Sequence, residues 1–179
     1  IVTGAGSGFG AGIARRFAAE GARVTVADIN AEAARIVAEE IGGIAQSVDV
    51  GDGASVAALA ATFGDVPDIL VNNAGITHLP AFMEDVTEED FDRVLRVNAK
   101  SVYLMARAFV PGMKARRSGA ILNIASTAGV SPRPRLNWYN ASKGWMITAT
   151  RAMAVELAPF GVRVNALNPV AGETPLLKS

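Results

Sequence analysis

A tyrosine and a lysine stand four positions apart in the stretch WYNASKGW, at Tyr139 and Lys143. In a helix this spacing places both side chains on one face, about 6 Å apart along the axis. A free phenol has a pKa of about 10, so it is a poor base at neutral pH unless a nearby cation stabilises the phenolate. Lys143 offers that cation. Taken alone, the pair is more simply explained by a solvated lysine and a half-buried tyrosine. Other residues of the chain are needed to distinguish this explanation from a catalytic pair.

Short β-rich runs alternate with alanine-rich helical stretches along the chain. The expected strands lie at 1–2, 23–27, 44–48, 69–71, 120–124 and 163–167. The expected helices lie at 9–20, 31–40, 54–63, 88–116 and 138–160. Parallel strands need crossover helices, so this alternation predicts a doubly wound α/β fold, one parallel sheet with helices on both faces. We expect residues 1–179 to form one nucleotide-binding domain that is trimmed at both ends.

The composition argues against several classes of protein. The 179 residues are 50% hydrophobic and carry 17 basic and 17 acidic side chains, so no single-sign field attracts nucleic acid or a membrane surface. The chain has no cysteine and a single histidine, His78, and therefore no metal site is expected. It contains no run of 18 apolar residues and no export signal, so we expect a cytoplasmic protein.

A glycine-rich turn, TGAGSGFG at residues 3–10, joins the first expected strand to the first helix. Gly4, Gly8 and Gly10 let the backbone turn tightly and let a pyrophosphate lie against the helix N-terminus. The next strand ends at Asp28, as the dinucleotide-binding fingerprint requires. Its carboxylate can bind ribose hydroxyls and repel a 2′-phosphate, so we predict NAD rather than NADP. The alternative is an aspartate that caps the next helix.

Asp49 ends the third expected strand, in the stretch SVDV. Ligands of such sheets bind beyond the carboxyl ends of the strands, so Asp49 could meet the adenine amino group. A solvated aspartate at a strand end is an equally good explanation.

These features together resemble the short-chain dehydrogenase/reductase family, in its compact single-domain branch. The resemblance spans Ile1 to about Thr174. It rests on TGxxxGxG, on NNAG at residues 72–75, on Ser126 placed 13 residues before the tyrosine, and on YxxSK at residues 139–143. The sugar-nucleotide epimerase branch usually carries a different glycine spacing, TGxxGxxG, which disfavours that branch.

The resemblance implies a catalytic tetrad. Tyr139 would exchange a proton with the substrate oxygen while hydride passes between the substrate carbon and the nicotinamide. Lys143 would lower the pKa of the tyrosine and hold the nicotinamide ribose, and Ser126 would bind the substrate oxygen. Asn98 would hold a water molecule in the proton relay, although an exposed position on its helix would also explain an asparagine there.

The resemblance also extends the cofactor site to the later strand ends. Asn73–Gly75 would pass the adenosine ribose, and Pro169–Thr174 would border the nicotinamide carboxamide. The residues expected to bind the cofactor are Gly4, Ser7, Gly8, Phe9, Gly10, Asp28, Ile29, Asp49, Val50, Asn73, Ala74, Gly75, Tyr139, Lys143, Pro169, Val170 and Thr174. Val170 departs from the family, which commonly has glycine after that proline. The crossover at 49–72 looks short for the family, which normally continues past Ser179.

We therefore predict an NAD-dependent enzyme that interconverts a secondary alcohol and a ketone. The alternatives are a 3-oxoacyl thioester reductase and a nucleotide-binding module without catalysis. The expected pocket walls are residues 76–80, residues 128–138 and the segment after Pro169. Arg133 and Arg135 could meet an anionic substrate, but solvated arginines are the simpler interpretation, and His78 is expected to be a hydrogen-bonding bystander.

We also predict a homo-oligomer. The helices at 88–116 and 138–160 are apolar around most of their circumference, whereas a helix on a sheet needs only one apolar stripe. The excess residues would form a subunit interface, unless a later segment of the same chain covers them. They are Val102, Tyr103, Met105, Ala106, Phe109, Trp145, Met146, Ile147, Ala149, Ala152, Met153 and Val155.

Overall fold

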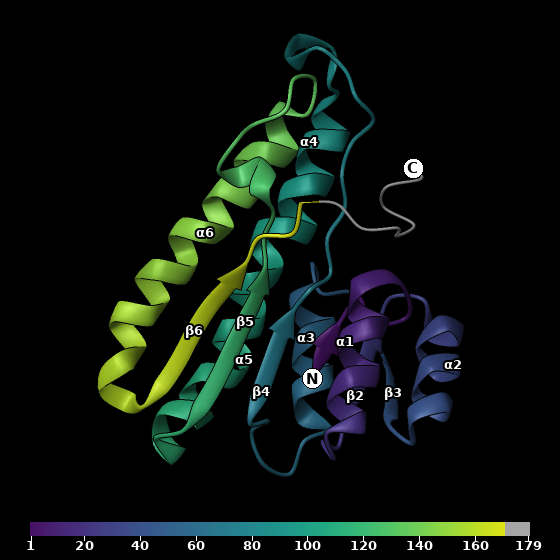
Figure 1. Cartoon of the computed structure of the whole chain (residues 1–179), viewed down its shortest axis with the longest axis vertical. Coiled ribbons are helices and arrows are strands. Elements are labelled where there is room, and N and C mark those ends of the chain that lie inside the picture. The colour runs from purple at the N-terminus through teal and green to yellow at the C-terminus, as the bar shows by residue number, and fades with distance from the viewer. Residues whose placement is uncertain (171–179) are drawn as a thin grey trace.

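The computed structural model describes residues 1–170, which build one six-stranded parallel sheet flanked by helices (Figure 1). The strands are β1 (Val2–Thr3), β2 (Thr25–Asp28), β3 (Ile44–Ser47), β4 (Ile69–Asn72), β5 (Gly119–Ile124) and β6 (Val162–Leu167). The helices are α1 (Gly8–Ala19), α2 (Ala31–Ile41), α3 (Gly53–Ala61), α4 (Glu88–Leu95), α5 (Ser101–Arg116) and α6 (Asn137–Leu157). Short 3₁₀ turns lie at Met83–Asp85, Thr127–Gly129 and Ala158–Phe160, and a π-helical turn lies at Arg96–Lys100.

The strand order is β3-β2-β1-β4-β5-β6, so the direction of winding reverses between β1 and β4. Val2 of β1 is in register with Val26 on one side and with Val71 on the other, both in parallel pairs. The predicted doubly wound fold is confirmed. In such sheets ligands bind beyond the carboxyl ends of the strands at the point of reversal, which here lies after Thr3 and Asn72.

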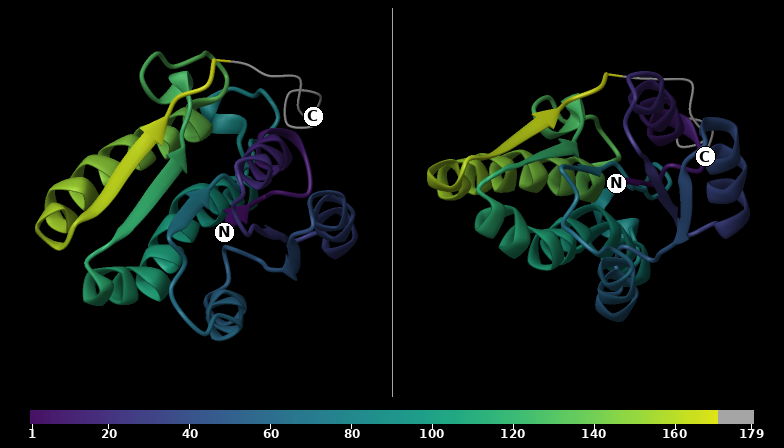
Figure 2. Two further views of the ribbon diagram at one scale, coloured as in Figure 1. Left: turned by 60° about the horizontal axis from the view of Figure 1, so that its bottom comes forward. Right: turned by 90° about the horizontal axis from the view of Figure 1, so that it is seen from below.

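Helices cover the two faces of the sheet unequally. The view from below shows α1 and α2 on one face and α3, α5 and α6 on the other (Figure 2). Small residues, Ala11 and Ala14 on α1, pack on Val2, Val26 and Val71 of the first face. This packing lets α1 lie close to the strand ends that its N-terminus must reach.

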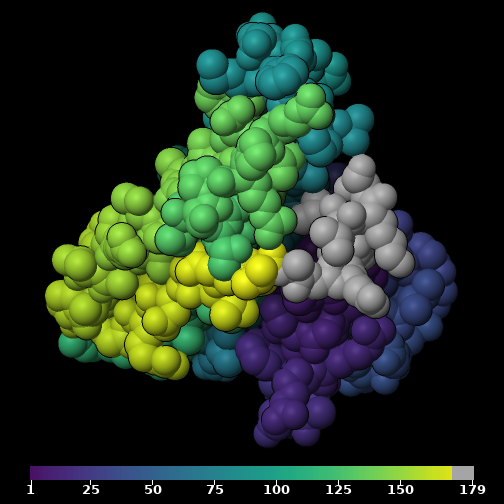
Figure 3. Space-filling model, turned by 45° about the horizontal axis from the view of Figure 1, so that its top comes forward, coloured from purple at the N-terminus to yellow at the C-terminus, as the bar shows by residue number. Residues whose placement is uncertain are grey.

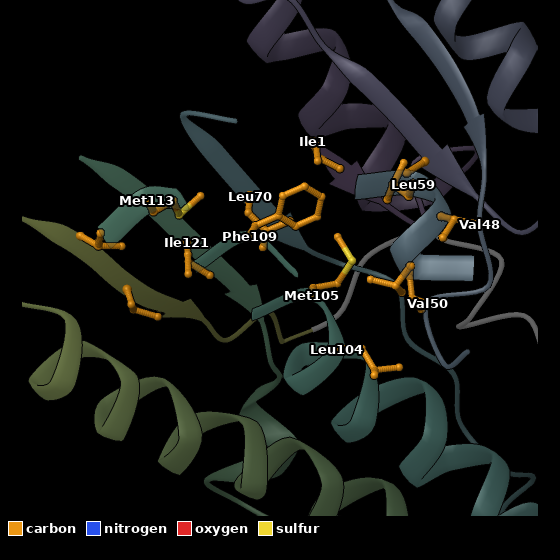
Figure 4. Close-up of a cluster of buried hydrophobic side chains, with 14 of the residues drawn as sticks. Ile1, Val48, Val50, Leu59, Leu70, Leu104, Met105, Phe109, Met113 and Ile121 are labelled. Carbon is orange, nitrogen blue, oxygen red and sulfur yellow. The ribbon is translucent and has the colours of Figure 1, made fainter. Parts of the chain in front are cut away.

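The larger hydrophobic cluster lies on the face of α3 and α5 (Figure 4). Leu70 and Ile121 of the sheet meet Met105, Phe109 and Met113 of α5, and all five are buried. Full burial of such a side chain contributes roughly 1.5–3 kcal/mol. The cluster therefore anchors α5, and with it the π-helical turn that precedes α5.

The N-terminus of α1 differs from those of the next three helices because it has no side-chain cap. Asn30, Asp52 and Thr87 each accept a hydrogen bond from a backbone N–H in the first turn of α2, α3 and α4. Ser7, at the start of α1, makes no such bond. The first N–H groups of α1 therefore have no side-chain partner and can receive an anion.

The structure corrects two details of the predicted elements. The expected helix at 88–116 is divided into α4, the π-helical turn and α5. The third strand ends at Ser47 and not at Asp49.

The apolar surface expected on the two long helices is smaller than predicted. Val102, Met105, Phe109 and Met146 are buried inside the chain, because they face the sheet or the neighbouring helix. Tyr103, Trp145 and Val155 are 53%, 44% and 79% exposed, so three of the predicted interface side chains remain accessible on α5 and α6. None of the helices that the structure describes is long and apolar enough to cross a membrane.

Candidate active site

The glycine-rich turn brings β1 and α1 into contact with the end of β4. Gly4 and Gly8 have φ angles of +60° and +53°, the left-handed region that glycine tolerates best. A Cβ on Gly10 would overlap the carbonyl oxygen of Gly4. Asn73 fixes the turn from the side, because its Nδ2 donates hydrogen bonds to the carbonyl oxygens of Thr3 and Gly4 at 2.8 and 3.1 Å.

Asp28 lies at the end of β2 with its carboxylate held by backbone groups. Oδ2 accepts from the N–H of Gly6 and Oδ1 from the N–H of Asn30, both at 2.9 Å. Asn30, and not Asp28, caps α2. The capping role considered for Asp28 is therefore filled by another residue, while the aspartate keeps a fixed orientation at the strand end.

Asp49 is joined to the π-helical turn by an ion pair that the sequence pattern did not indicate. Arg96 Nη1 lies 2.7 Å from Asp49 Oδ2, and the N–H of Gly51 donates to Oδ1 at 2.9 Å. Burial alone would raise the pKa of Asp49, but these hydrogen bonds outweigh it and hold that pKa below its usual value. Asp49 is thus not a free, solvated aspartate.

Asn98 lies in the π-helical turn and is fully buried, so the exposed position considered for it is wrong. Its Oδ1 accepts from the N–H of Ile76 at 2.9 Å. Its Nδ2 donates to the carbonyl oxygen of Ile76 at 2.9 Å and to Ser142 Oγ at 3.0 Å. Ser142 Oγ in turn donates to the carbonyl oxygen of Tyr139 at 2.7 Å. Asn98 therefore links the loop after β4 to the helix that carries the tyrosine.

Tyr139 and Lys143 lie one turn apart on α6, as their spacing predicts. Lys143 is 4% exposed, and its Nζ lies 5.8 Å from the centroid of the Tyr139 ring. Nζ also donates to the carbonyl oxygen of Ile124, at the end of β5, at 2.9 Å. Burial lowers the pKa of Lys143 from the ordinary value of 10.5 to about 8. The ammonium is thus largely shielded from water and lies beside the phenol ring.

Ser126 follows β5 and begins the 3₁₀ turn at Thr127–Gly129. It is buried, and its Oγ accepts from the N–H of Ala128 at 3.1 Å, which leaves the hydroxyl hydrogen available to a further acceptor. The carbonyl oxygen of Pro169 accepts from the N–H of Thr127 at 3.1 Å, so the end of β6 is fixed beside this turn.

A cavity of about 670 Å³ runs along the carboxyl ends of the strands. Most of the predicted site residues line it: Gly4, Ser7, Gly8, Phe9, Asp28, Ile29, Asp49, Val50, Asn73, Ala74, Gly75, Ser126, Tyr139, Lys143, Pro169 and Val170. Gly10 and Asn98 lie behind the lining, and Thr174 lies outside the described residues. A cavity of this size is large enough for a cofactor-sized ligand.

Two loops form the wall at the tyrosine end of this cavity. The N–H of Ala81 donates to the carbonyl oxygen of Arg135 at 3.1 Å, and the guanidinium of Arg135 lies 4.7 Å from the ring centroid of Phe82. These loops, near residues 77–86 and 130–136, lie together at one end of the molecule in the space-filling view (Figure 3, teal and green). Ile76, Thr77, Ala128, Arg133 and Leu136 of the predicted walls line the cavity.

The lining of the cavity also differs from the prediction at several residues. Arg93, Arg96 and Val97 also line the cavity, and only their closeness to Asn98 in the sequence could have indicated them. His78 does not line it: the side chain is buried, and Nδ1 lies 2.8 Å from the carbonyl oxygen of Leu79. Among residues 1–170, no group of three or more His, Cys, Asp or Glu side chains is arranged to hold a metal ion.

The fold and this row of strand-end groups define a dinucleotide-type α/β domain with a tyrosine and a lysine at one end of its cavity. The family model for the short chain dehydrogenases matches residues 1–179, and the chain belongs to the short-chain dehydrogenase/reductase family of oxidoreductases. The family binds nicotinamide cofactors and acts on small molecules.

Named relatives cover nearly all of the chain. The 4-formylbenzenesulfonate dehydrogenase of Comamonas testosteroni is 48% identical over 99% of this chain and 73% of its own length. The D-threitol dehydrogenase of Mycolicibacterium smegmatis is 39% identical over 98% and 70%. A crystal structure of 3-ketoacyl-(acyl-carrier-protein) reductase from Brucella melitensis complexed with NADH has a TM-score of 0.96 and 51% identity, and covers 98% of this chain and 76% of that one.

Proposed function

We propose that the protein is an NAD(H)-dependent oxidoreductase that interconverts a secondary alcohol and a ketone, with Tyr139 as the acid/base. The observation that carries the proposal is the buried Lys143 beside Tyr139, in one cavity with Ser126. A solvated lysine, the simpler explanation of the sequence pattern, does not describe this site. Residues 1–179 would act as one nucleotide-binding domain that also holds the catalytic groups.

The described residues fit a dinucleotide. The first N–H groups of α1 have no side-chain cap, and Gly4, Gly8 and Gly10 leave backbone free to approach phosphate. The oriented carboxylate of Asp28 supports recognition of the adenosine ribose hydroxyls and disfavours a 2′-phosphate, which is why we propose NAD rather than NADP. When bound, the nicotinamide supplies or accepts the hydride.

The chain's own groups would handle the proton. Tyr139 would donate a proton to the carbonyl oxygen in reduction and take it back in oxidation. Lys143 would favour the phenolate through its charge, which is shielded from water because the lysine is buried beside the half-buried Tyr139. Ser126 would donate its free hydroxyl hydrogen to the same substrate oxygen. Asn98 would hold the loop after β4 and the helix α6 at a constant separation, through Ile76 and Ser142.

A 3-oxoacyl thioester reductase is the second candidate. Reduction of this kind usually draws on NADPH, and Asp28 argues against that cofactor. However, the structure of the Brucella melitensis 3-ketoacyl reductase was obtained with NADH, at 51% identity to this chain. The cofactor alone therefore does not separate the two substrate classes. A nucleotide-binding module without catalysis is disfavoured, since it would have no need to keep Ser126, Tyr139 and Lys143 together in one cavity.

Tyr139→Phe tests the proposal. The variant should lose a factor of about 10²–10⁴ in turnover, because it removes the exchangeable proton, and should bind NADH with nearly unchanged affinity. Turnover is measured with a panel of alcohols, ketones and oxoacyl thioesters, and binding by NADH fluorescence. A variant that keeps most of its activity would overturn the assigned role of Tyr139, and a wild-type protein that turns over none of the panel would favour the binding module.

A further inference from the structure

Arg133 differs from the other cations of the cavity. Four basic side chains line it: Arg93, Arg96, Arg133 and Lys143. Arg93 pairs with Asp90 and Arg96 pairs with Asp49, each at 2.7 Å. Lys143 lies beside the phenol. Within residues 1–170 no carboxylate forms an ion pair with Arg133. Among the four basic side chains of the lining, Arg133 therefore has neither a described counter-ion nor a proposed catalytic role.

The backbone of Arg133 is held in place. Pro132 and Pro134 flank it and restrict its φ/ψ freedom. The buried Asn140, which follows the tyrosine, donates from Nδ2 to the carbonyl oxygen of Arg133 at 2.7 Å. A side chain on such a rigid base loses less entropy when it binds a ligand.

The guanidinium of Arg133 is also oriented. Its Nη2 donates to the carbonyl oxygen of Val170 at 3.0 Å, and both residues line the cavity. A guanidinium has five N–H donors in a planar fork, so this one bond leaves most of them available to an anion. The hydrogen bond to Val170 therefore orients the guanidinium while most of its N–H donors stay available.

The location of Arg133 favours the substrate end of the cavity. Val170 follows Pro169, whose carbonyl oxygen accepts a hydrogen bond from the N–H of Thr127, the residue after Ser126. Of the two carboxylates in the lining, Asp28 ends β2 and Asp49 follows β3, and these strands lie at the opposite edge of the sheet from β5 and β6. An anion at Arg133 therefore avoids both carboxylates and lies near the proposed site of proton transfer.

We infer that the substrate of this enzyme carries an anionic group, a carboxylate, sulfonate or phosphate, and that Arg133 binds it while the reacting carbon faces Tyr139. This inference rests on the proposed function, because it names the substrate class of the same site. The competing role for Arg133 is a contact to the pyrophosphate of the cofactor. The uncapped N–H groups at the start of α1, within the glycine-rich turn, would instead bind that anion.

A matched pair of ketones tests the inference: para-acetylbenzoate and its uncharged methyl ester. With NADH, the wild-type protein should prefer the carboxylate in kcat/KM by about 10- to 100-fold, as expected for a charge-assisted hydrogen bond. Arg133→Gln should remove that preference, and Arg133→Lys should keep part of it. Arg135→Gln is the matched control, because the guanidinium of Arg135 stacks on Phe82 and does not line the cavity, and it should leave the preference unchanged.

Calorimetry on the NAD⁺-loaded protein separates this inference from the proposed function, because neither ketone can be reduced there. Tighter binding of the carboxylate than of the ester, lost in Arg133→Gln alone, supports the inference even if neither ketone is turned over with NADH. Equal binding of the two, or no binding of either, by the wild-type protein overturns it. A Kd for NADH that rises about tenfold in Arg133→Gln, with the ketone preference unchanged, overturns it in favour of the cofactor pyrophosphate.

Discussion

Lys143→Met should abolish turnover and weaken cofactor binding. It should also remove a pH-dependent destabilisation of the folded protein, the free energy of burying the charge of Lys143. Burial lowers the pKa of Lys143 from the ordinary value of 10.5 to about 8. At neutral pH, the folded and unfolded chains both carry the protonated lysine, so the folded chain bears the whole cost of burying the charge. The difference between the two pKa values corresponds to about 3 kcal/mol.

The sign of the pH dependence follows from where the proton is held. Between pH 8 and pH 10.5 the unfolded chain retains a proton that the folded chain releases, so the folded state gains stability as the pH rises. Methionine removes this dependence. It also removes the hydrogen bond to the carbonyl oxygen of Ile124, at a cost of about 1–3 kcal/mol that does not vary with pH in the variant. The slope is therefore a sharper measure than the difference in stability at any one pH.

Urea unfolding without added cofactor, from neutral pH to about pH 10, measures the two free energies of unfolding. The difference between them should be nearly constant below pH 8 and should shift toward the wild type by about 1.4 kcal/mol per pH unit above it. Lys100→Met, at an exposed position, is the control and should show no such change. Parallel pH profiles of the free energy of unfolding for the wild type and Lys143→Met would show that the buried ammonium does not destabilise the folded protein as proposed.

Three further predictions concern the cofactor site and the assembly. The wild type should prefer NAD(H) over NADP(H) by at least about tenfold in kcat/KM, and Asp28→Ala should relax the preference; equal use of both cofactors by the wild type would refute this role for Asp28. Gly10→Ala should weaken NADH binding by at least about tenfold, because the new Cβ displaces the Gly4 carbonyl, whereas Gly12→Ala, at an open position of the same helix, should leave it unchanged. Light scattering at micromolar concentration should give a homo-oligomer, dimer or tetramer, through the outer side of α5 and α6 that exposes Tyr103 and Trp145; a monomer would instead favour a cover supplied by the same chain.

The fold could be predicted from the sequence because it depends on patterns that repeat locally. Alternating strands and helices require parallel pairing, and the glycine spacing predicts where α1 begins. The spacing of Tyr139 and Lys143 predicts a shared helix face, since both lie on one element. What these patterns share is a short distance along the chain.

The parts of the site that were not predicted depend on contacts between distant segments. The ion pair of Arg96 with Asp49 joins residues 47 positions apart, and no local pattern indicates it. The π-helical turn that buries Asn98 depends on partners in the loop after β4 and on α6, so a helical pattern over 88–116 cannot reveal it. Burial of Met105 and Phe109 likewise follows from how α5 lies on the sheet rather than from its own composition.

The contact between Gly129 and α6 has a consequence for how this enzyme could change its substrate. A Cβ on Gly129 would lie 2.7 Å from the backbone N of Gly144 and 2.7 Å from the backbone C of Lys143, so two main chains meet there without side chains between them. The spacing between the turn that carries Ser126 and the helix that carries Tyr139 is thus set by backbone alone, which cannot repack. The loop at 130–136 is tied to α6 by the hydrogen bond from Asn140 to the carbonyl oxygen of Arg133, but the atoms nearest to Gly129 are backbone atoms of α6 and belong to neither of the loops that wall the tyrosine end. New pocket walls could therefore evolve, or be engineered, while the proton-transfer geometry stays constant.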